Sequence, residues 1–119
     1  MAVPPDFSTV KTQADGAFRA GDFEKAADIY SQALEVLQSH QGESQGSVEA
    51  DRLKIYSNRS LTFQKLQKWT EALEDAKKAV GLDPKRSKSW FRLGQTLAGL
   101  DLFAEAVTAY DTGCKLDPR

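Results

Sequence analysis

Two basic side chains near the carboxyl-terminal end of the sequence are spaced so that they could bind an anion together. Lys88 and Arg92 lie in the stretch SKSWFRLGQTL (87–97), where Trp90 and Leu97 follow the period of an amphipathic helix. Residues four apart lie one turn above each other on a helix, and like charges so placed destabilise an isolated helix by roughly 0.2–0.5 kcal/mol. A negative group that contacts this face would explain the pair, but on spacing alone two cations more often mark a solvated helix face.

Asn58 is a third candidate, because asparagine is unfavourable inside a helix. It occurs in YSNRS (56–60), within a segment of helical periodicity, and its side chain competes with the helix for backbone hydrogen bonds. The amide could donate a hydrogen bond to a carboxylate without adding charge. A buried hydrogen bond between two helices would explain the residue equally well, so both interpretations stay open.

The sequence carries no set of residues that predicts catalysis or a metal site. It has one histidine, His40, and one cysteine, Cys114, whereas a zinc site needs several such ligands. The stretches GAFRAG (16–21) and GQTLAG (94–99) share the glycine spacing of a phosphate-binding loop but lack its lysine. Cys114 is expected to be buried as a small apolar residue. We therefore expect that the chain is not an enzyme and uses no cofactor or metal.

The composition is typical of a soluble domain that binds neither nucleic acid nor membranes. Sixteen Lys and Arg residues oppose 17 Asp and Glu residues, so the formal net charge is −1, whereas those partners favour a basic excess. No apolar run approaches the ~20 residues of a membrane span, and the start, MAVPPDFSTV, does not resemble a signal peptide. A single cysteine permits no internal disulfide. These features predict a cytoplasmic protein.

The sequence repeats itself with a period of 34 residues. The segment 56–84 aligns with the segment 90–118 at that offset throughout, so that Trp69 corresponds to Phe103. An earlier copy begins near residue 7, at an offset of 46 from the second copy, so about 12 residues are inserted between the two. Each copy contains two segments of helical periodicity. A period of this length predicts a fold of stacked helical units.

We expect two helices in each copy, packed closely against each other. Gly21 favours the left-handed conformation that ends a helix, and Asp22 and Asp101 are the expected N-caps of the helices that follow. Small side chains at equivalent places in the three copies would let paired helices approach closely; these are Ala26, Ala72 and Ala106. The expected helices are 6–20, 23–40, 50–66, 70–82, 87–100 and 103–116. An insertion loop is expected over about 41–52, and helical extensions at both of its ends are the alternative.

The 34-residue pattern resembles the tetratricopeptide repeat (TPR). In the third copy, WFRLGQTL (90–97) matches W-x-x-L-G-x-x-L, and Ala106, Tyr110 and Pro118 follow at the expected places. The resemblance covers essentially the whole chain. It implies an all-α fold in which three tandem helix-turn-helix repeats stack in a right-handed superhelix, with the first helix of each repeat lining a concave groove. The single domain would span 1–119, with repeats over about 7–40, 53–86 and 87–119.

One subset of this family, in co-chaperones of the seventy- and ninety-kilodalton heat-shock proteins, binds the chaperone's C-terminal Glu-Glu-Val-Asp through a five-residue carboxylate clamp. The resemblance places Lys11, Asn58, Lys88 and Arg92 at four clamp positions, and Asp15 at the fifth, where the family has asparagine. By the same resemblance, Phe18, Leu61, Gln64 and Lys65 would contact the peptide upstream of its terminus.

Asp15 departs from the clamp pattern in a way that should weaken the binding of a carboxylate. An ionised carboxylate only accepts hydrogen bonds, and at about 4 Å from a ligand carboxylate it would cost roughly 1–4 kcal/mol. Lys11, one turn earlier, could partly neutralise it, but would then be a weaker member of the clamp. We expect a clamp of reduced affinity, which Asp15→Asn should tighten and Arg92→Ala should nearly abolish.

Two functions stay open for such a groove. The first is an adaptor that binds the acidic C-terminus of a heat-shock chaperone; the second is a scaffold that binds an internal segment of an unrelated protein. The sequence also stops directly after the third repeat, where a repeat array normally has a polar-faced cap. We therefore expect a domain from a longer protein, monomeric by itself, whose last helix exposes apolar residues; self-association through that helix is the alternative.

Overall fold

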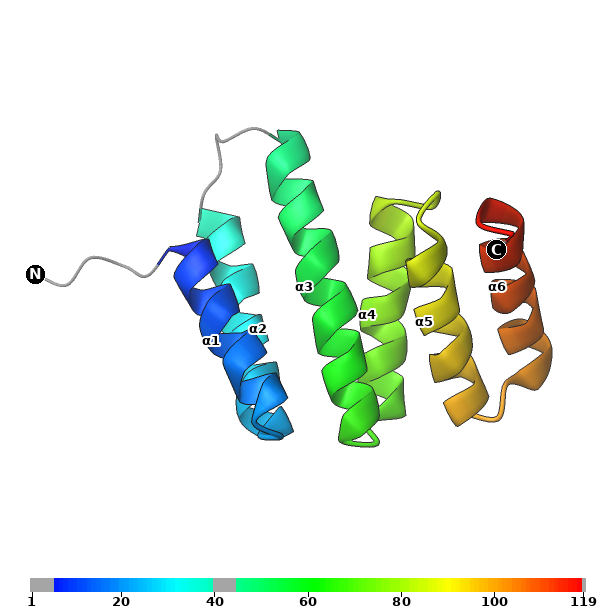
Figure 1. The fold of residues 1–119 in the computed structure, drawn as a ribbon, viewed down its shortest axis with the longest axis horizontal. Coiled ribbons are helices and arrows are strands. Elements are labelled where there is room, and N and C mark those ends of the chain that lie inside the picture. Colours follow the sequence, from blue (N-terminus) through cyan, green and yellow to red (C-terminus); the bar gives the residue numbers. More distant parts are fainter. Residues whose placement is uncertain (1–5, 40–44, 119) are drawn as a thin grey trace, which may run out of the picture.

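The part of the chain that the structure describes forms six α-helices arranged as three hairpins (Figure 1). The structure, a computed structural model, describes residues 6–39 and 45–118. Within each hairpin, α1 packs against α2, α3 against α4 and α5 against α6, while α2–α3 and α4–α5 contacts join the hairpins. The predicted all-α fold of three tandem repeats is confirmed. The helices are α1 (Phe7–Arg19), α2 (Phe23–Ser39), α3 (Gln45–Lys65), α4 (Trp69–Leu82), α5 (Ser87–Gly99) and α6 (Phe103–Leu116).

The insertion between the first two repeats is largely helical. The loop predicted over 41–52 is wrong from Gln45 onwards, because α3 begins there. Val48 is 9% exposed and Ile55 is fully buried, and residues seven apart lie on the same face of a helix. This buried face stabilises an early turn of α3, which agrees with the alternative of a helical extension at the carboxyl end of the segment. Residues 40–44 lie outside the described part of the chain.

The turn inside each hairpin has the same backbone geometry. Gly21, Gln67 and Asp101 occupy equivalent places in the repeats and have φ angles of 84°, 59° and 62°. In each turn two backbone N–H groups donate back to carbonyls of the preceding helix; after α5 these hydrogen bonds are 2.9 and 3.0 Å long. This is the Schellman motif that closes a helix with one left-handed residue. The predicted role of Gly21 is confirmed.

Of the two N-caps predicted from the sequence, one is confirmed and the other is wrong. Asp22 accepts a hydrogen bond from the Lys25 backbone N–H at 3.3 Å, so its role as the cap of α2 is confirmed. The prediction for Asp101 is wrong, because the N-cap of α6 is Leu102, which makes no side-chain capping bond. Asp101 is the counterpart of Gly21 rather than of Asp22, so its place is the left-handed residue after α5.

Small residues bring the helices of each hairpin close together. The equivalent alanines, Ala26, Ala72 and Ala106, are 0%, 0% and 3% exposed, which confirms their predicted role. Gly94 in α5 lies against the ring of Tyr110 in α6, and a Cβ atom at Gly94 would lie 2.9 Å from that ring. The packed helices leave no room there for a larger side chain.

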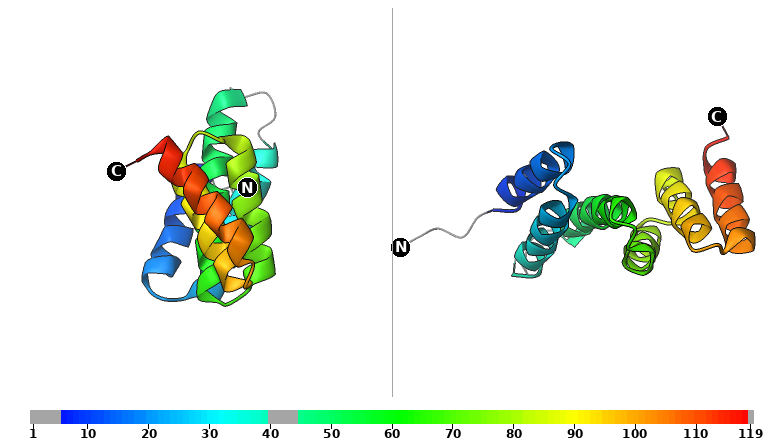
Figure 2. Two further views of the ribbon diagram at one scale, coloured as in Figure 1. Left: turned by 90° about the vertical axis from the view of Figure 1, so that its right-hand side faces the viewer. Right: turned by 90° about the horizontal axis from the view of Figure 1, so that it is seen from below.

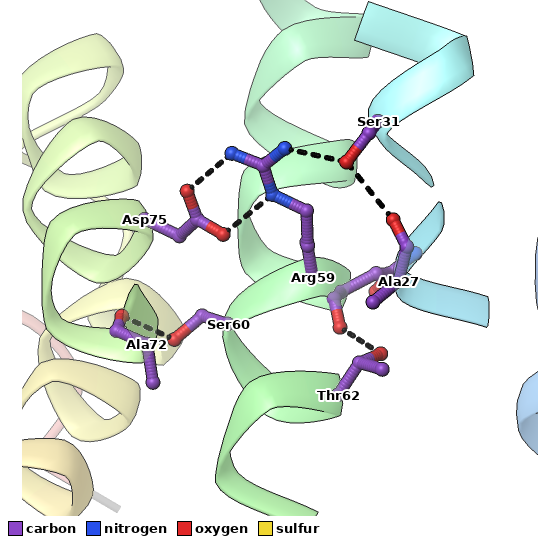
Figure 3. A network of polar contacts seen from close by, with 8 residues as sticks. Ala27, Ser31, Arg59, Ser60, Thr62, Ala72 and Asp75 are labelled. Atoms are coloured by element: carbon purple, nitrogen blue, oxygen red, sulfur yellow. Dashed lines mark hydrogen bonds and ion pairs between the residues drawn. The ribbon is translucent and has the colours of Figure 1, made fainter. Parts of the chain in front are cut away.

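A largely buried ion pair joins the helices of the second hairpin and connects them to the first. Arg59 in α3 donates to both carboxylate oxygens of Asp75 in α4 at 2.7 Å, and to the Ser31 hydroxyl in α2 at 3.0 Å (Figure 3). The hydrogen bonds to Asp75 raise the pKa of the Arg59 guanidinium, against the lowering effect of burial. The charge of Arg59 is therefore satisfied within the fold.

The hairpins stack along one direction into a molecule of 53 × 31 × 23 Å. Seen from below in Figure 2, the first helices, α1, α3 and α5, lie toward one side, and α2 and α4 toward the other. We call the side formed by α1, α3 and α5 the groove face. At the far end of the stack, α6 and the turn before it expose Leu102, Phe103, Val107 and Leu116.

Candidate functional site

The five clamp residues predicted from the sequence lie on the first helices of the three hairpins. Lys11 and Asp15 lie on α1, Asn58 on α3, and Lys88 and Arg92 on α5, the helices that form the groove face (Figure 2). The fold brings Asp15 and Asn58 to one hollow between α1 and α3. Lys11 lies one turn before Asp15, and Lys88 and Arg92 lie on the next helix along the groove face.

Asp15 is held by two donors from within the chain. Lys11 Nζ lies 2.8 Å from Asp15 Oδ2, and the hydroxyl of Tyr30 in α2 donates to Asp15 Oδ1 at 2.5 Å. Burial of Tyr30, and then its hydrogen bond to Asp15, raise the pKa of its hydroxyl. Asp15 therefore joins α1 to α2, and the ion pair agrees with the expectation that Lys11 partly neutralises its charge.

A hollow of about 220 Å³ opens beside Asp15. This volume is below the ~300–1,000 Å³ of a typical small-molecule pocket and suits one or two side chains of a peptide. The Phe18 ring packs edge-on against Phe23 with 5.2 Å between ring centroids, which fixes that wall. The lining residues are Asp15, Phe18 and Arg19 from α1, Tyr30 from α2, and Asn58 and Leu61 from α3.

Arg92 is a half-buried basic group of the groove face with one unsatisfied donor. Its Nε is buried and has no hydrogen-bond partner, and its Nη1 donates only to the Gln95 amide oxygen, at 3.1 Å. Burial lowers the pKa of the Arg92 guanidinium. Among the described residues, no carboxylate pairs with Arg92 or with the exposed Lys88. A half-buried guanidinium without an acid is well suited to bind a carboxylate through two parallel hydrogen bonds.

The four flanking residues predicted from the sequence have separate environments. Phe18 and Leu61 line the hollow together. The Gln64 amide donates to the Thr96 hydroxyl in α5 at 2.8 Å and so joins two helices of the groove face. Lys65 is exposed at the end of α3.

Arg19 and Tyr30 belong to the hollow but were not predicted as site residues. Arg19 lies in the last turn of α1, where a cation is expected simply to stabilise the end of the helix. Tyr30 follows the apolar pattern of α2 and is 2% exposed. The sequence spacing could have identified Arg19, because Arg19 lies four residues after Asp15 and therefore on the same side of α1.

The described residues contain neither a candidate metal site nor a helix that is both long and apolar enough to cross a membrane. His40 lies outside the described residues. Cys114, expected to be buried, is exposed, so that prediction is wrong. It lies on α6, the last helix of the stack, and no further described helix packs over that side.

The sequence model described as "Tetratricopeptide repeat" matches residues 58–119. The chain is 36% identical over 107 residues to "Tetratricopeptide repeat protein 28" of Homo sapiens and to "Heat shock protein STI1" of Saccharomyces cerevisiae. It is 34% identical over 110 residues to human "Serine/threonine-protein phosphatase 5". These matches cover 90%, 90% and 92% of this chain but only 4%, 16% and 20% of the three relatives.

Two similar solved structures contain peptides. The first is "Second TPR of Spaghetti (RPAP3) bound to HSP90 peptide SRMEEVD", with a TM-score of 0.77, 25% identity, and coverage of 94% of this chain and 93% of that one. The other is the second TPR domain of human RPAP3 in complex with the HSP70 peptide SGPTIEEVD, with a TM-score of 0.75 and 27% identity. This match covers 92% of this chain and 81% of the human RPAP3 chain.

Proposed function

The chain belongs to the tetratricopeptide repeat family, and we propose that its groove face binds the acidic C-terminal Glu-Glu-Val-Asp segment of heat-shock chaperones of the seventy- and ninety-kilodalton classes. Two similar domains have been solved with HSP90 and HSP70 peptides that end in these four residues. In this proposal the chain is a co-chaperone module that acts by binding and has no catalytic activity of its own.

The observation that carries the proposal is the unsatisfied guanidinium of Arg92. A buried Nε without a partner is unfavourable, and a ligand carboxylate could accept from Nε and from an Nη group together. Lys88, one turn earlier and exposed, adds a second cation for the same carboxylate. In the proposed clamp Asn58 donates to the other terminal carboxylate from α3, while Lys11 contributes less because Asp15 already holds it.

The rest of the groove face would contact the peptide upstream of its terminus. Phe18 and Leu61 provide apolar walls in the hollow between α1 and α3. Lys65 is exposed at the end of α3 and could pair with a glutamate of the peptide. Gln64 is tied to Thr96, so we expect it to contribute mainly by holding α3 and α5 at a fixed spacing.

A second candidate function is supported by Asp15. Its carboxylate lines the hollow and can accept further hydrogen bonds from a ligand. An internal segment of a partner protein that places a cation or a backbone N–H group there would match this acceptor, and it would need no free terminal carboxylate. The chain would then be a scaffold rather than a reader of chaperone C-termini.

Calorimetric titration with the peptide SRMEEVD, as the free acid and with an amidated C-terminus, separates the two functions. We expect amidation to remove most of the affinity. We expect Arg92→Ala to weaken binding of the free acid by about 10- to 100-fold, because hydrogen bonds to charged groups contribute roughly 1.5–3 kcal/mol each. Lys77→Ala, which removes an exposed cation from α4 outside the groove face, should change the affinity less than about twofold.

The results that would contradict the clamp are equally specific. Equal affinity for the acid and the amide would favour the scaffold function. An unchanged affinity in Arg92→Ala, with the peptide still bound, would remove the clamp as the mode of recognition.

We further propose that residues 1–119 act as one domain, with repeats over about 7–40, 53–86 and 87–119, and that this domain is monomeric and cytoplasmic. The near-balanced charge of −1 supports a peptide partner over nucleic acid or a membrane surface. Sedimentation of the chain at several concentrations tests the monomeric state.

A further inference from the structure

We propose that Arg19 binds a carboxylate of the ligand's C-terminal residue and replaces Lys11 as the cation of the first helix in the clamp. This inference rests on the proposed function of the groove face. It assigns a binding role to a residue outside the clamp pattern and gives a reason why Asp15 can stand where the pattern has asparagine.

The charge of Lys11 is already engaged inside the fold. Its ammonium lies 2.8 Å from the Asp15 carboxylate, and both side chains are 28% exposed. The other oxygen of Asp15 accepts from Tyr30, which fixes the carboxylate against α2. A ligand carboxylate that recruited Lys11 would have to break this ion pair and leave Asp15 with a single donor. Lys11 is therefore poorly placed to bind a second carboxylate.

Arg19 is free for a ligand. It is exposed and lines the same hollow as Asp15 and Asn58. Its charge acts on Tyr30, another residue that lines the hollow, and opposes the rise in the pKa of the Tyr30 hydroxyl. No hydrogen bond or ion pair of the Arg19 side chain occurs within the described residues, although Asp15 lies one turn before it. All of its guanidinium donors are thus available.

The stripe of α1 that faces the ligand alternates in charge. Lys11, Asp15 and Arg19 follow each other at intervals of four residues, so they lie on one side of the helix. Lys11 neutralises Asp15, which leaves Arg19 as the net positive charge of the stripe. Asn58 stands on the opposite wall of the hollow, on α3. A carboxylate between the two walls could accept from the Asn58 amide and from two Arg19 donors.

The test is a double-mutant cycle, read by calorimetric titration with SRMEEVD as the free acid. We expect Arg19→Gln to weaken binding about 10-fold or more, as for a lost hydrogen bond to a charged group. The matched control is Lys25→Gln, which removes another exposed cation near the start of α2 that does not line this hollow. It should change the affinity less than about twofold.

The cycle also tests whether Arg19 replaces Lys11. Asp15→Asn supplies an amide donor and releases Lys11, so it should tighten binding. In that background we expect Arg19→Gln to weaken binding less than about threefold, because Lys11 then supplies the cation. Thermal unfolding of every variant is the control that tests whether each one is folded.

The proposal is overturned if Arg19→Gln behaves like Lys25→Gln, or if its effect is the same with Asp15 and with Asn at that position. Either result together with a large loss in Arg92→Ala would leave the proposed function intact. If the unaltered chain binds the free-acid and amidated peptides equally, both the proposed function and this inference fail.

Discussion

At the scale of single residues, two arginines on neighbouring helices show how pairing separates a structural cation from one that is available to a ligand. Arg59 binds both oxygens of Asp75, and this raises the pKa of its guanidinium. Arg92 is half-buried without an acid, and burial lowers the pKa of its guanidinium. Arg59 thus has its anion within the fold, whereas no carboxylate among the described residues pairs with Arg92.

Tyr30 couples the hollow beside Asp15 to stability at high pH. Its hydroxyl is protonated in the fold, where burial and the bond to Asp15 raise its pKa above the ordinary value of 10.0. Above pH 10 the unfolded chain loses this proton while the folded chain keeps it. The stabilisation is therefore complete below pH 10 and is lost as the pH rises toward the folded pKa.

We expect Tyr30→Phe to lower the free energy of unfolding at pH 8 by about 1–2 kcal/mol, because Asp15 loses a donor. The difference between the variant and the unaltered chain should shrink as the pH rises above 10. Urea unfolding at pH 8, 10 and 11 measures it. Tyr110→Phe is the control, because the Tyr110 ring packs near Phe91 without a hydrogen bond to its hydroxyl in the described structure. A difference that stays constant over this range would contradict the pKa assignment.

At the residue scale, the positions of Asn58, Lys88 and Arg92 follow from the repeat frame, since a fixed period places equivalent residues on equivalent helix faces. The position of Tyr30, which donates a hydrogen bond to Asp15, does not follow from the repeat frame. Tyr30 lies 15 residues further along the chain and reaches Asp15 only because the hairpin folds α2 back against α1. Nothing in the local pattern distinguishes a core tyrosine from one whose hydroxyl fixes a site residue.

At the scale of elements, the hairpin turns are held by backbone geometry more than by capping side chains. All three turns place one residue in the left-handed conformation, but only the first uses glycine there. An L-residue in this conformation costs roughly 1–2 kcal/mol, less for Asp than for Gln. The second and third hairpins therefore carry backbone strain that the first does not.

Gln67→Gly should relieve this strain and raise the free energy of unfolding by about 0.5–1 kcal/mol, since the freedom of glycine in the unfolded chain offsets part of the gain. Asp101→Gly should give a smaller increase. The reverse change, Gly21→Ala, has open space for its Cβ, so it isolates the backbone effect and should lower stability by about 1 kcal/mol. Urea unfolding measures all three. A loss of stability in Gln67→Gly would contradict the assignment.

The ion pair between α3 and α4 is a largely buried connection with two hydrogen bonds. We expect Asp75→Ala to lower the free energy of unfolding by about 3–5 kcal/mol, because it leaves the Arg59 charge buried and unpaired. Replacing both residues, as Arg59→Met with Asp75→Leu, should recover most of that loss. Thermal and urea unfolding test both variants.

An exposed ion pair of the same chain supplies the control. Lys115 and Asp111 in α6 lie 3.1 Å apart, with side chains 77% and 61% exposed. Asp111→Ala should change stability by no more than about 0.5 kcal/mol. Equal effects of Asp75→Ala and Asp111→Ala would contradict the role given to the buried pair.

The elements themselves were largely predictable, since five of the six predicted helices agree closely with the structure and α3 begins early. Helical periodicity encodes which residues face the core, and that information is local. The early turn of α3 depends on Val48 packing in the folded molecule, which a polar segment such as 39–50 does not reveal. The predicted cap at Asp101 is wrong because Asp101 is the left-handed residue of the turn, so that Leu102 is the residue before α6.

At the scale of the whole molecule, one position of the repeat is packed against the next hairpin in the middle of the stack. The same position is exposed to solvent in α6, at the end of the stack. Leu73 in α4 packs against the core shared with α5, whereas its counterpart 34 residues later, Val107 in α6, is 65% exposed. In a stacked array each unit contacts only its neighbours, so the last unit lacks one interface. The sequence gives the two residues similar chemistry, and only their place in the stack separates them.

This asymmetry predicts that a lysine at the two equivalent positions has unequal effects on stability. Leu73→Lys should lower the free energy of unfolding by roughly 1–3 kcal/mol, because it removes apolar contacts between α4 and α5. Val107→Lys should change it by no more than about 0.5 kcal/mol, as for an exposed position. Urea unfolding at low and high protein concentration measures both. A large loss for Val107→Lys that appears only at high concentration would show that copies of the chain cover the α6 face in solution, and would contradict the proposed monomer.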